Sequence, residues 1–185
     1  MREKRIIRSL KWRGSLLLLA AVGGWFGLTA HAVSDTQPGP CVGDPQSRQL
    51  DYWLGNWTMT KPGDSGSSTS KVYLSLDQCV FIEHWENGKG HVAEKMFAYS
   101  PDDKNWYGMF ADNEGRAHIF LEGKVTSGIA EFHGPSRGPN GEAVLNKLSV
   151  VRVLANKVEE TWQKSTDNGA SWTTVYRAEY TRANP

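Results

Sequence analysis

Residues 79–100 read CVFIEHWENGKGHVAEKMFAYS, and this stretch predicts two β-strands joined by a tight turn. Valine, isoleucine and aromatic residues, which favour strands, alternate here with polar residues on both sides of NGKG at residues 87–90. Successive side chains of a strand point to opposite faces of a sheet, so this alternation separates an inner set from an outer set. The stretch therefore indicates a hairpin of an antiparallel sheet.

The same pattern of short strands and turns continues to the end of the chain. After residue 55 there is no helical period longer than about three turns, and no repeat of about 20 to 50 residues that would indicate a propeller. Ten strands are predicted, at residues 55–61, 69–76, 79–86, 91–99, 104–111, 116–121, 127–133, 143–154, 157–164 and 172–182.

Short connections between successive strands favour an all-β fold, an antiparallel up-and-down β-barrel of about ten strands, because closure removes exposed sheet edges. A two-sheet sandwich is the alternative. A barrel of this strand number is wider than its side chains fill, so it can hold a ligand. A short helix is predicted before the barrel, with Asp44 as its cap, Pro45 in its first turn and Gly55 at its end.

Residues 1–32 predict a signal peptide, since a basic start and an apolar run end in Ala30-His31-Ala32. An uncleaved membrane anchor is the alternative. Without this segment Lys+Arg falls from 21 to 15 and Asp+Glu from 20 to 19, which gives no basic face for nucleic acid. We expect a secreted or periplasmic protein without a stable membrane anchor after cleavage. Its extended lead-in covers residues 33–43 and a single domain covers residues 44–185.

Two cysteines, Cys41 and Cys79, follow the predicted cleavage point. In an oxidising compartment such a pair indicates one disulfide, which contributes about 4 kcal/mol in the chain-entropy model. A reactive thiol pair is the alternative, but the C-x-x-C spacing is lacking.

The sequence Gly55-Asn56-Trp57 opens the first strand and resembles the G-x-W signature of lipocalins and other calycins. The resemblance implies a lipocalin-like barrel with Trp57 at its closed end and a late basic residue, Arg177 or Arg182, packed across the ring. LDYWLGNW, DQCVFIEHWENGKG, YSPDDKNWYGMFADNEG and VEETWQKSTDNGASWTTVYRAEYTR together resemble a family of secreted bacterial proteins of unknown function with such a barrel, over residues 48–182. That resemblance implies the fold and transfers no catalytic residue.

One further motif, S-x-D-x-G-x-x-W, is formed by Ser165, Asp167, Gly169 and Trp172. It resembles the Asp-box of sialidases, which lies in a turn away from the reaction centre and repeats from blade to blade. Because it occurs once here, between two alternating strands, it indicates a rigid turn of the last hairpin and argues against glycosidase activity.

Aromatic side chains with a few polar groups suit a pocket for a small apolar or amphipathic molecule, although plain barrel core is the alternative. The predicted ligand-binding residues are Glu83, Trp85, Trp106, Phe110, Glu160 and Trp162.

A turn at residues 87–90 places Glu83 opposite Glu94, an acid pair that needs a shared proton or a cation between the two carboxylates. The alternatives are a turn that differs by one residue, which separates the two acids, or neutralisation by a base such as Arg152.

His84, Glu86 and His91 share the other predicted face, so a metal site is conceivable, as is haem by analogy with some calycin barrels. A solvated rim is the alternative, and His118 and His133 fit surface or core positions. No motif supports either group, so neither a metal nor a cofactor is predicted.

Three functions follow as expectations. The first is binding of a small ligand, the second an isomerase- or cyclase-like enzyme with Glu83 as its acid/base, and the third an envelope interaction or structural protein. The sequence contains no nucleophile motif and no phosphate-binding loop, and it leaves the oligomeric state open.

Overall fold

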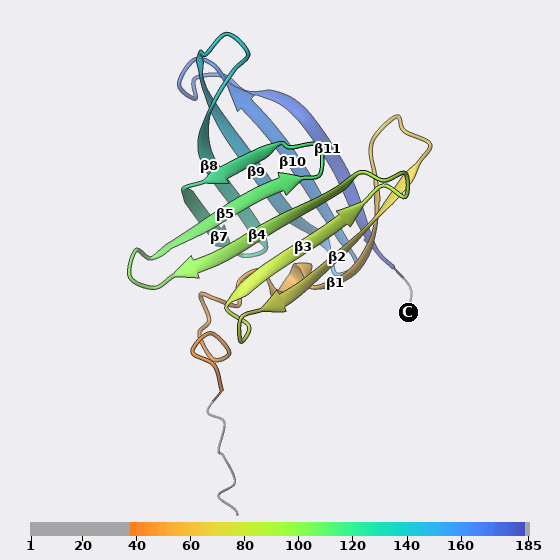
Figure 1. The fold of residues 1–185 in the computed structure, drawn as a ribbon. Coiled ribbons are helices and arrows are strands. Elements are labelled where there is room, and N and C mark those ends of the chain that lie inside the picture. The colour runs from red at the N-terminus through yellow and green to blue at the C-terminus, as the bar shows by residue number, and fades with distance from the viewer. Residues whose placement is uncertain (1–37, 184–185) are drawn as a thin grey trace, which may run out of the picture. The chain divides into compact units, whose positions relative to one another are not determined.

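The computed structural model describes residues 38–183, so the predicted signal peptide at residues 1–32 lies outside the described residues. One antiparallel sheet curls into a nearly closed barrel, in which β3–β5 lie opposite β9–β11 (Figure 1). Its strands are β1 (Gly55–Thr60), β2 (Ser67–Ser75), β3 (Val80–Glu86), β4 (Val92–Ser100), β5 (Asn105–Asp112), β6 (Ala117–Phe120), β7 (Glu122–Thr126), β8 (Ile129–Arg137), β9 (Ala143–Leu154), β10 (Lys157–Ser165) and β11 (Thr173–Arg182).

The predicted up-and-down barrel is confirmed, with eleven strands where about ten were expected. The additional strand is β7, whose sequence EGKVT is short and gives a weak signal, because Gly123 takes one of its two less exposed positions and Val125 is its one apolar side chain. β1 pairs with β11, so the first and last strands join within the sheet and the two open edges are β6 and β7. No helix within residues 38–183 is long and apolar enough to cross a membrane.

The barrel closes where the chain passes from β6 to β7 through Leu121. The Leu121 backbone N–H donates to the His133 carbonyl of β8 at 2.9 Å. The Asn105 side chain bridges the two edges, because it donates to the Leu121 carbonyl at 2.9 Å and accepts from the Gly123 N–H at 3.0 Å. These bonds replace the regular ladder at the seam and satisfy backbone groups that an open edge would leave unpaired.

Two glycines let the seam approach closely. A methyl group on Gly123 would overlap the backbone oxygen of Trp106, and one on Gly134 would overlap the carbonyl of Ile119. Both obstacles are backbone, which cannot move aside as a flexible side chain can.

The closed end of the barrel is built around Trp57. Its indole N–H donates to the Trp53 carbonyl at 2.8 Å, and both rings are buried. Arg182 lies across Trp57 at 4.3 Å and donates to the Leu54 carbonyl at 2.9 Å. Of the two late arginines, Arg182 takes this position, whereas Arg177 forms an exposed pair with Glu159 at 2.6 Å.

The segment before β1 is less helical than predicted, since turns lead into a single 3-10 helix, η1 (Asp51–Trp53). Asp44 still caps the first turn, because its carboxylate accepts from the N–H groups of Gln46 and Ser47. The predicted disulfide between Cys41 and Cys79 is present and ties this segment to the β2–β3 turn.

The motif at residues 165–172 forms the turn between β10 and β11. The Ser165 hydroxyl accepts from the Gly169 N–H at 2.8 Å, and Asp167 accepts from the Ser171 N–H at 2.9 Å. Hydrogen bonds from the side chains of Ser165 and Ser171 lower the pKa of Asp167 to about 2. The turn is thus held by its own side chains, and Trp172 packs against Lys147 rather than facing the barrel pocket.

Replacement of Gly134 by Ala tests the seam. The added methyl group meets the Ile119 backbone, so we expect a loss of about 1–3 kcal/mol or more in unfolding free energy, measured by denaturant titration. Gly43→Ala is the matched control, since a methyl group added there would meet no atom within 4 Å, and it should change stability by less than about 0.5 kcal/mol. Equal effects of the two substitutions would contradict the close seam.

Candidate functional site

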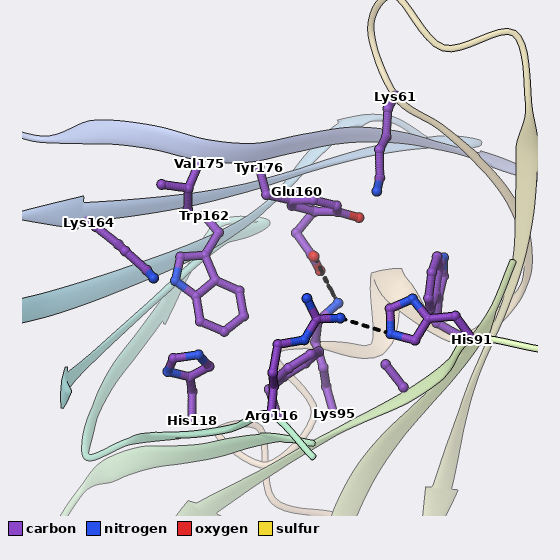
Figure 2. A pocket seen from close by; sticks show the side chains of 13 residues that line it. Lys61, His91, Lys95, Arg116, His118, Glu160, Trp162, Lys164, Val175 and Tyr176 are labelled. Atoms are coloured by element: carbon purple, nitrogen blue, oxygen red, sulfur yellow. Dashed lines mark hydrogen bonds and ion pairs between the residues drawn. The ribbon is translucent and has the colours of Figure 1, made fainter. Parts of the chain in front are cut away.

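A pocket of about 300 Å³ opens at the end of the barrel opposite to Trp57 and is drawn in Figure 2. Its side chains come from β3, β4, β5, β6, β10 and β11 and from the adjoining loops, so no single segment forms it. The lining residues are Lys61, Trp85, His91, Ala93, Lys95, Phe110, Arg116, His118, Glu160, Trp162, Lys164, Val175 and Tyr176.

The floor of the pocket is a buried cluster of three charged groups. Lys95 of β4 lies beside Glu83 of β3, its register partner, and reaches across the barrel to Glu160 of β10 (Figure 2). Its ammonium is 2.6 Å from Glu83 Oε2 and 2.8 Å from each oxygen of Glu160. The second oxygen of Glu83 accepts from the Ser70 hydroxyl at 2.7 Å. Both carboxylate oxygens of Glu83 therefore accept hydrogen bonds inside the barrel.

Burial and charge act in opposite directions on these groups. Burial lowers the pKa of Lys95, but Glu160 and Glu83 outweigh it and raise that pKa above its ordinary value, so the ammonium stays charged. Burial raises the pKa of Glu160 to about 7, with Lys95 opposing the rise and Glu83 adding to it. Uptake of one proton by Glu160 near neutral pH removes one of the two carboxylate charges that face Lys95.

The walls are aromatic. Trp162 meets Phe110 edge-to-face at 5.4 Å and His118 at 4.8 Å, and its indole N–H donates to Asn146 at 3.1 Å. Tyr176 forms the wall above Glu160, and burial raises the pKa of its phenol above the ordinary range, so it stays neutral. These rings offer a large apolar surface with few exposed polar groups.

The mouth carries positive charge from three elements. Lys61 follows β1 and its ammonium lies 5.1 Å from the Tyr176 ring centre, while Lys164 extends from β10 near Trp162 (Figure 2). Arg116, in the β5–β6 turn, is bound to Asp112 at 2.6 Å and to Glu114 at 2.7 Å.

Asp112 anchors this turn. Burial raises its pKa, but hydrogen bonds from the backbone and side chain of Arg116 and from His91 outweigh burial and lower it to about 2.

Of the six predicted ligand-binding residues, Trp85, Phe110, Glu160 and Trp162 line the pocket. Glu83 lies below it, covered by its bonds to Lys95 and Ser70. Trp106 lies outside the pocket lining and packs on Phe81 at 5.9 Å in the core.

The residues that sequence reasoning missed include all four Lys and Arg side chains of the lining, namely Lys61, Lys95, Arg116 and Lys164. For Lys95 a signal was available, because it alternates with Ala93 and Phe97 on the buried side of β4. A lysine on an apolar face needs an anionic partner inside the protein. The partners came from β3 and from β10, and only the fold brings β10 near.

The predicted pairing of Glu83 with Glu94 was wrong by one residue. The β3–β4 loop runs to His91, whose carbonyl accepts from the Asn87 N–H at 3.1 Å, so the turn is longer than residues 87–90. Glu83 consequently pairs with Lys95, and Glu94 pairs with His84 on the outer face. The buried counter-ion is therefore Lys95.

Arg152 is not the base that neutralises the acids. It lies 5.7 Å from the Tyr52 ring, away from the pocket lining.

The three residues considered for a metal site do not converge. His84 contacts Glu94 at 3.2 Å, whereas His91 packs on Trp85, which faces the other side of β3. His91 does lie near Asp112 and Glu114, but the Arg116 guanidinium occupies the space between these acids. Arg116 thus already supplies the positive charge that a metal ion would bring to Asp112 and Glu114.

Comparison of the chain with protein-family models and with curated proteins finds no match. The resemblance to the lipocalin-like family therefore stays a prediction, and the site is interpreted from its own geometry.

Replacement of Lys95 by Met tests the floor. Loss of the ammonium leaves two carboxylates unpaired in the interior, which costs about 3–5 kcal/mol of unfolding free energy at pH 8. Without the opposing charge of Lys95, burial makes Glu160 hold its proton more tightly in the folded than in the unfolded state, so the variant gains stability as the pH falls from 8 towards 5.

The matched control is Lys71→Met, since Lys71 is exposed on β2 and pairs across to outward-facing His84. Adding Glu160→Gln to Lys95→Met should restore part of the lost stability. A loss that is independent of pH and similar to that of the control would contradict a buried charge cluster.

Proposed function

We propose that this protein binds a small amphipathic molecule in the pocket of its barrel. The observation that carries the proposal is a buried floor in which Lys95 bonds to both Glu83 and Glu160, beneath walls of Phe110, Trp162 and Tyr176. A purely structural barrel would fill this space with apolar side chains, because a buried ion pair adds little stability over a well-packed apolar core. The volume of about 300 Å³ is at the lower end of the range for small-molecule sites.

We also propose that the chain works outside the cytoplasm. The Cys41–Cys79 disulfide supports this location, because disulfides persist mainly in oxidising compartments. The basic and apolar residues that end in Ala30-His31-Ala32 support it from the sequence.

A second candidate function is proton transfer to a bound substrate, with Glu160 in place of the predicted Glu83. The supporting observation is that Glu160 lines the pocket and has a pKa of about 7, which suits a group that both accepts and returns a proton. Glu83 lacks access to the pocket, because Ser70 and Lys95 cover it. In such a reaction Glu160 takes a proton from one carbon of the ligand and returns it to another, an isomerisation without net proton change.

The third expectation, an interaction surface, has support of a different kind. Cross-strand partners on the outer wall of β2–β6 form one apolar row, of which Met96, Met109 and Ile119 are at least 43% exposed. Such rows occur at contact surfaces between proteins. This candidate does not use the pocket and is therefore separable from ligand binding.

Binding is tested with N-phenyl-1-naphthylamine, a neutral probe whose fluorescence rises in apolar surroundings. We expect the probe to bind, and Ala93→Leu, which fills the pocket beside Lys95, to weaken binding by roughly tenfold, a change of about 1.4 kcal/mol. Ala117→Leu is the matched control, because Ala117 is exposed on β6 and outside the pocket.

Phe110→Ala provides a second variant in which a wall is removed rather than the cavity filled, so a folding defect of one variant leaves the test intact. Unchanged probe affinity in both folded variants would place the probe elsewhere and contradict the proposal. Native mass spectrometry of freshly purified protein shows whether a ligand is carried along. If that ligand is converted by the wild type but not by Glu160→Gln, proton transfer is the function; recovery of unchanged ligand supports binding alone.

A further inference from the structure

The charges around the pocket are opposite in sign to the net charge of the sequence that follows residue 32. After residue 32 the sequence contains 15 Lys+Arg and 19 Asp+Glu. Among the 13 lining residues, in contrast, four are Lys or Arg and one, Glu160, is acidic. A cationic pocket in this acidic part of the sequence concentrates anions locally and does not follow from the composition of that part.

Two of the four cations are already neutralised. Lys95 is held by Glu83 and Glu160, and Arg116 is held by Asp112 and Glu114. Lys61 and Lys164, in contrast, form no ion pair with any carboxylate in the part of the chain that the structure describes. The remaining positive charge of the pocket therefore belongs to its mouth.

Lys61 is placed over the entrance by the aromatic walls. Its ammonium lies 5.1 Å from the ring centre of Tyr176 and 6.0 Å from that of Trp85, where cation–π attraction holds it. Lys164 lies on the other side of Trp162, close enough to His118 that its charge, after burial, helps to lower the pKa of that imidazole. Both burial and the nearby Lys164 charge therefore favour the neutral imidazole of His118.

The floor does not suit an anionic group. Both oxygens of Glu160 and one of Glu83 already bond to Lys95, so the ammonium has no free side for a further acid. An anion placed there would also face two carboxylates. An acid group on a ligand is therefore excluded from the floor and attracted to the mouth, while the aromatic walls between these levels take an apolar body.

We propose that the pocket selects small amphipathic anions, with the acid group at the mouth, paired with Lys61 or with Lys164, and the apolar body against Phe110 and Trp162. The acid is a carboxylate, sulfate or phosphate monoester on an aliphatic or aromatic body. This inference rests on the proposed binding function and adds the charge and the orientation of the ligand.

The test compares two probes of one chain length, decanoate and 1-decanol, as competitors of the neutral fluorescent probe at pH 8 and low salt. We expect decanoate to bind about tenfold more tightly, as charge-assisted hydrogen bonds to one or two ammonium groups predict. Added sodium chloride should reduce this preference without weakening the binding of 1-decanol, because salt screens the interaction between exposed charges. Decyl sulfate and decyl phosphate in the same assay distinguish the three acid groups.

The variants are Lys61→Gln, Lys164→Gln and the double variant, with Lys124→Gln as matched control, an exposed lysine of β7 outside the pocket. The double variant should lose about tenfold in decanoate affinity and stay within about twofold of wild type for 1-decanol. The control should change neither value. Unfolding midpoints close to wild type show that the variants are folded, which is expected of side chains at the mouth.

The results separate the inference from the function on which it rests. Equal affinity for decanoate and 1-decanol, or an equal loss of both in the double variant, overturns the anion preference and leaves ligand binding in place. Competition by 1-decanol alone, or by neither compound while the fluorescent probe binds, also overturns it. If the fluorescent probe itself does not bind, the proposed function fails, and the inference fails with it.

Discussion

The ion cluster of Lys95, Glu83 and Glu160 is the constraint on which the interior of this barrel depends. Two of its members are neighbours in the β3–β4 hairpin, and the third comes from β10, 65 residues after Lys95 in the chain. A lysine and two glutamates in an apolar interior are tolerated only together, because each alone would be an unpaired buried charge. The pairing therefore fixes the register of β3 on β4 and the approach of that hairpin to the opposite wall.

The same cluster separates a packed part of the barrel from a hollow part. Below it the space is filled by an apolar core that includes Phe81, Phe97 and Trp57, and Arg182 covers that end. Above it the space remains a pocket, because a charged floor cannot be covered by apolar side chains without loss of hydrogen-bonding partners. Because burial raises the pKa of Glu160 to about 7, the net charge of the floor also changes near neutral pH.

Sequence reasoning reached the architecture but not the geometry of the site. The alternation of apolar and polar residues was sufficient for ten of the eleven strands, and β7 was missed because glycine at position 123 leaves Val125 as the one apolar side chain of EGKVT. The short helix was overestimated, since the local signals at Asp44 and Gly55 mark the ends of a turn-rich segment and do not specify its hydrogen-bond period. At the β3–β4 turn, a loop one residue longer than assumed moved Glu83 from Glu94 to Lys95, because the side-chain period of a strand is two.

By itself the sequence determined the all-β class, the order of the strands, the disulfide pair and the aromatic residues Trp85, Phe110 and Trp162 of the pocket wall. These follow from local patterns and from residue type. Only the tertiary structure decided the partner of each buried charge, the place of Trp106 in the core and the placement of Lys61 and Lys164 on opposite sides of the mouth. The physical reason is that barrel closure brings β4 and β10 together through the curvature and register of the whole sheet. Neither quantity can be predicted from the sequence of a single strand.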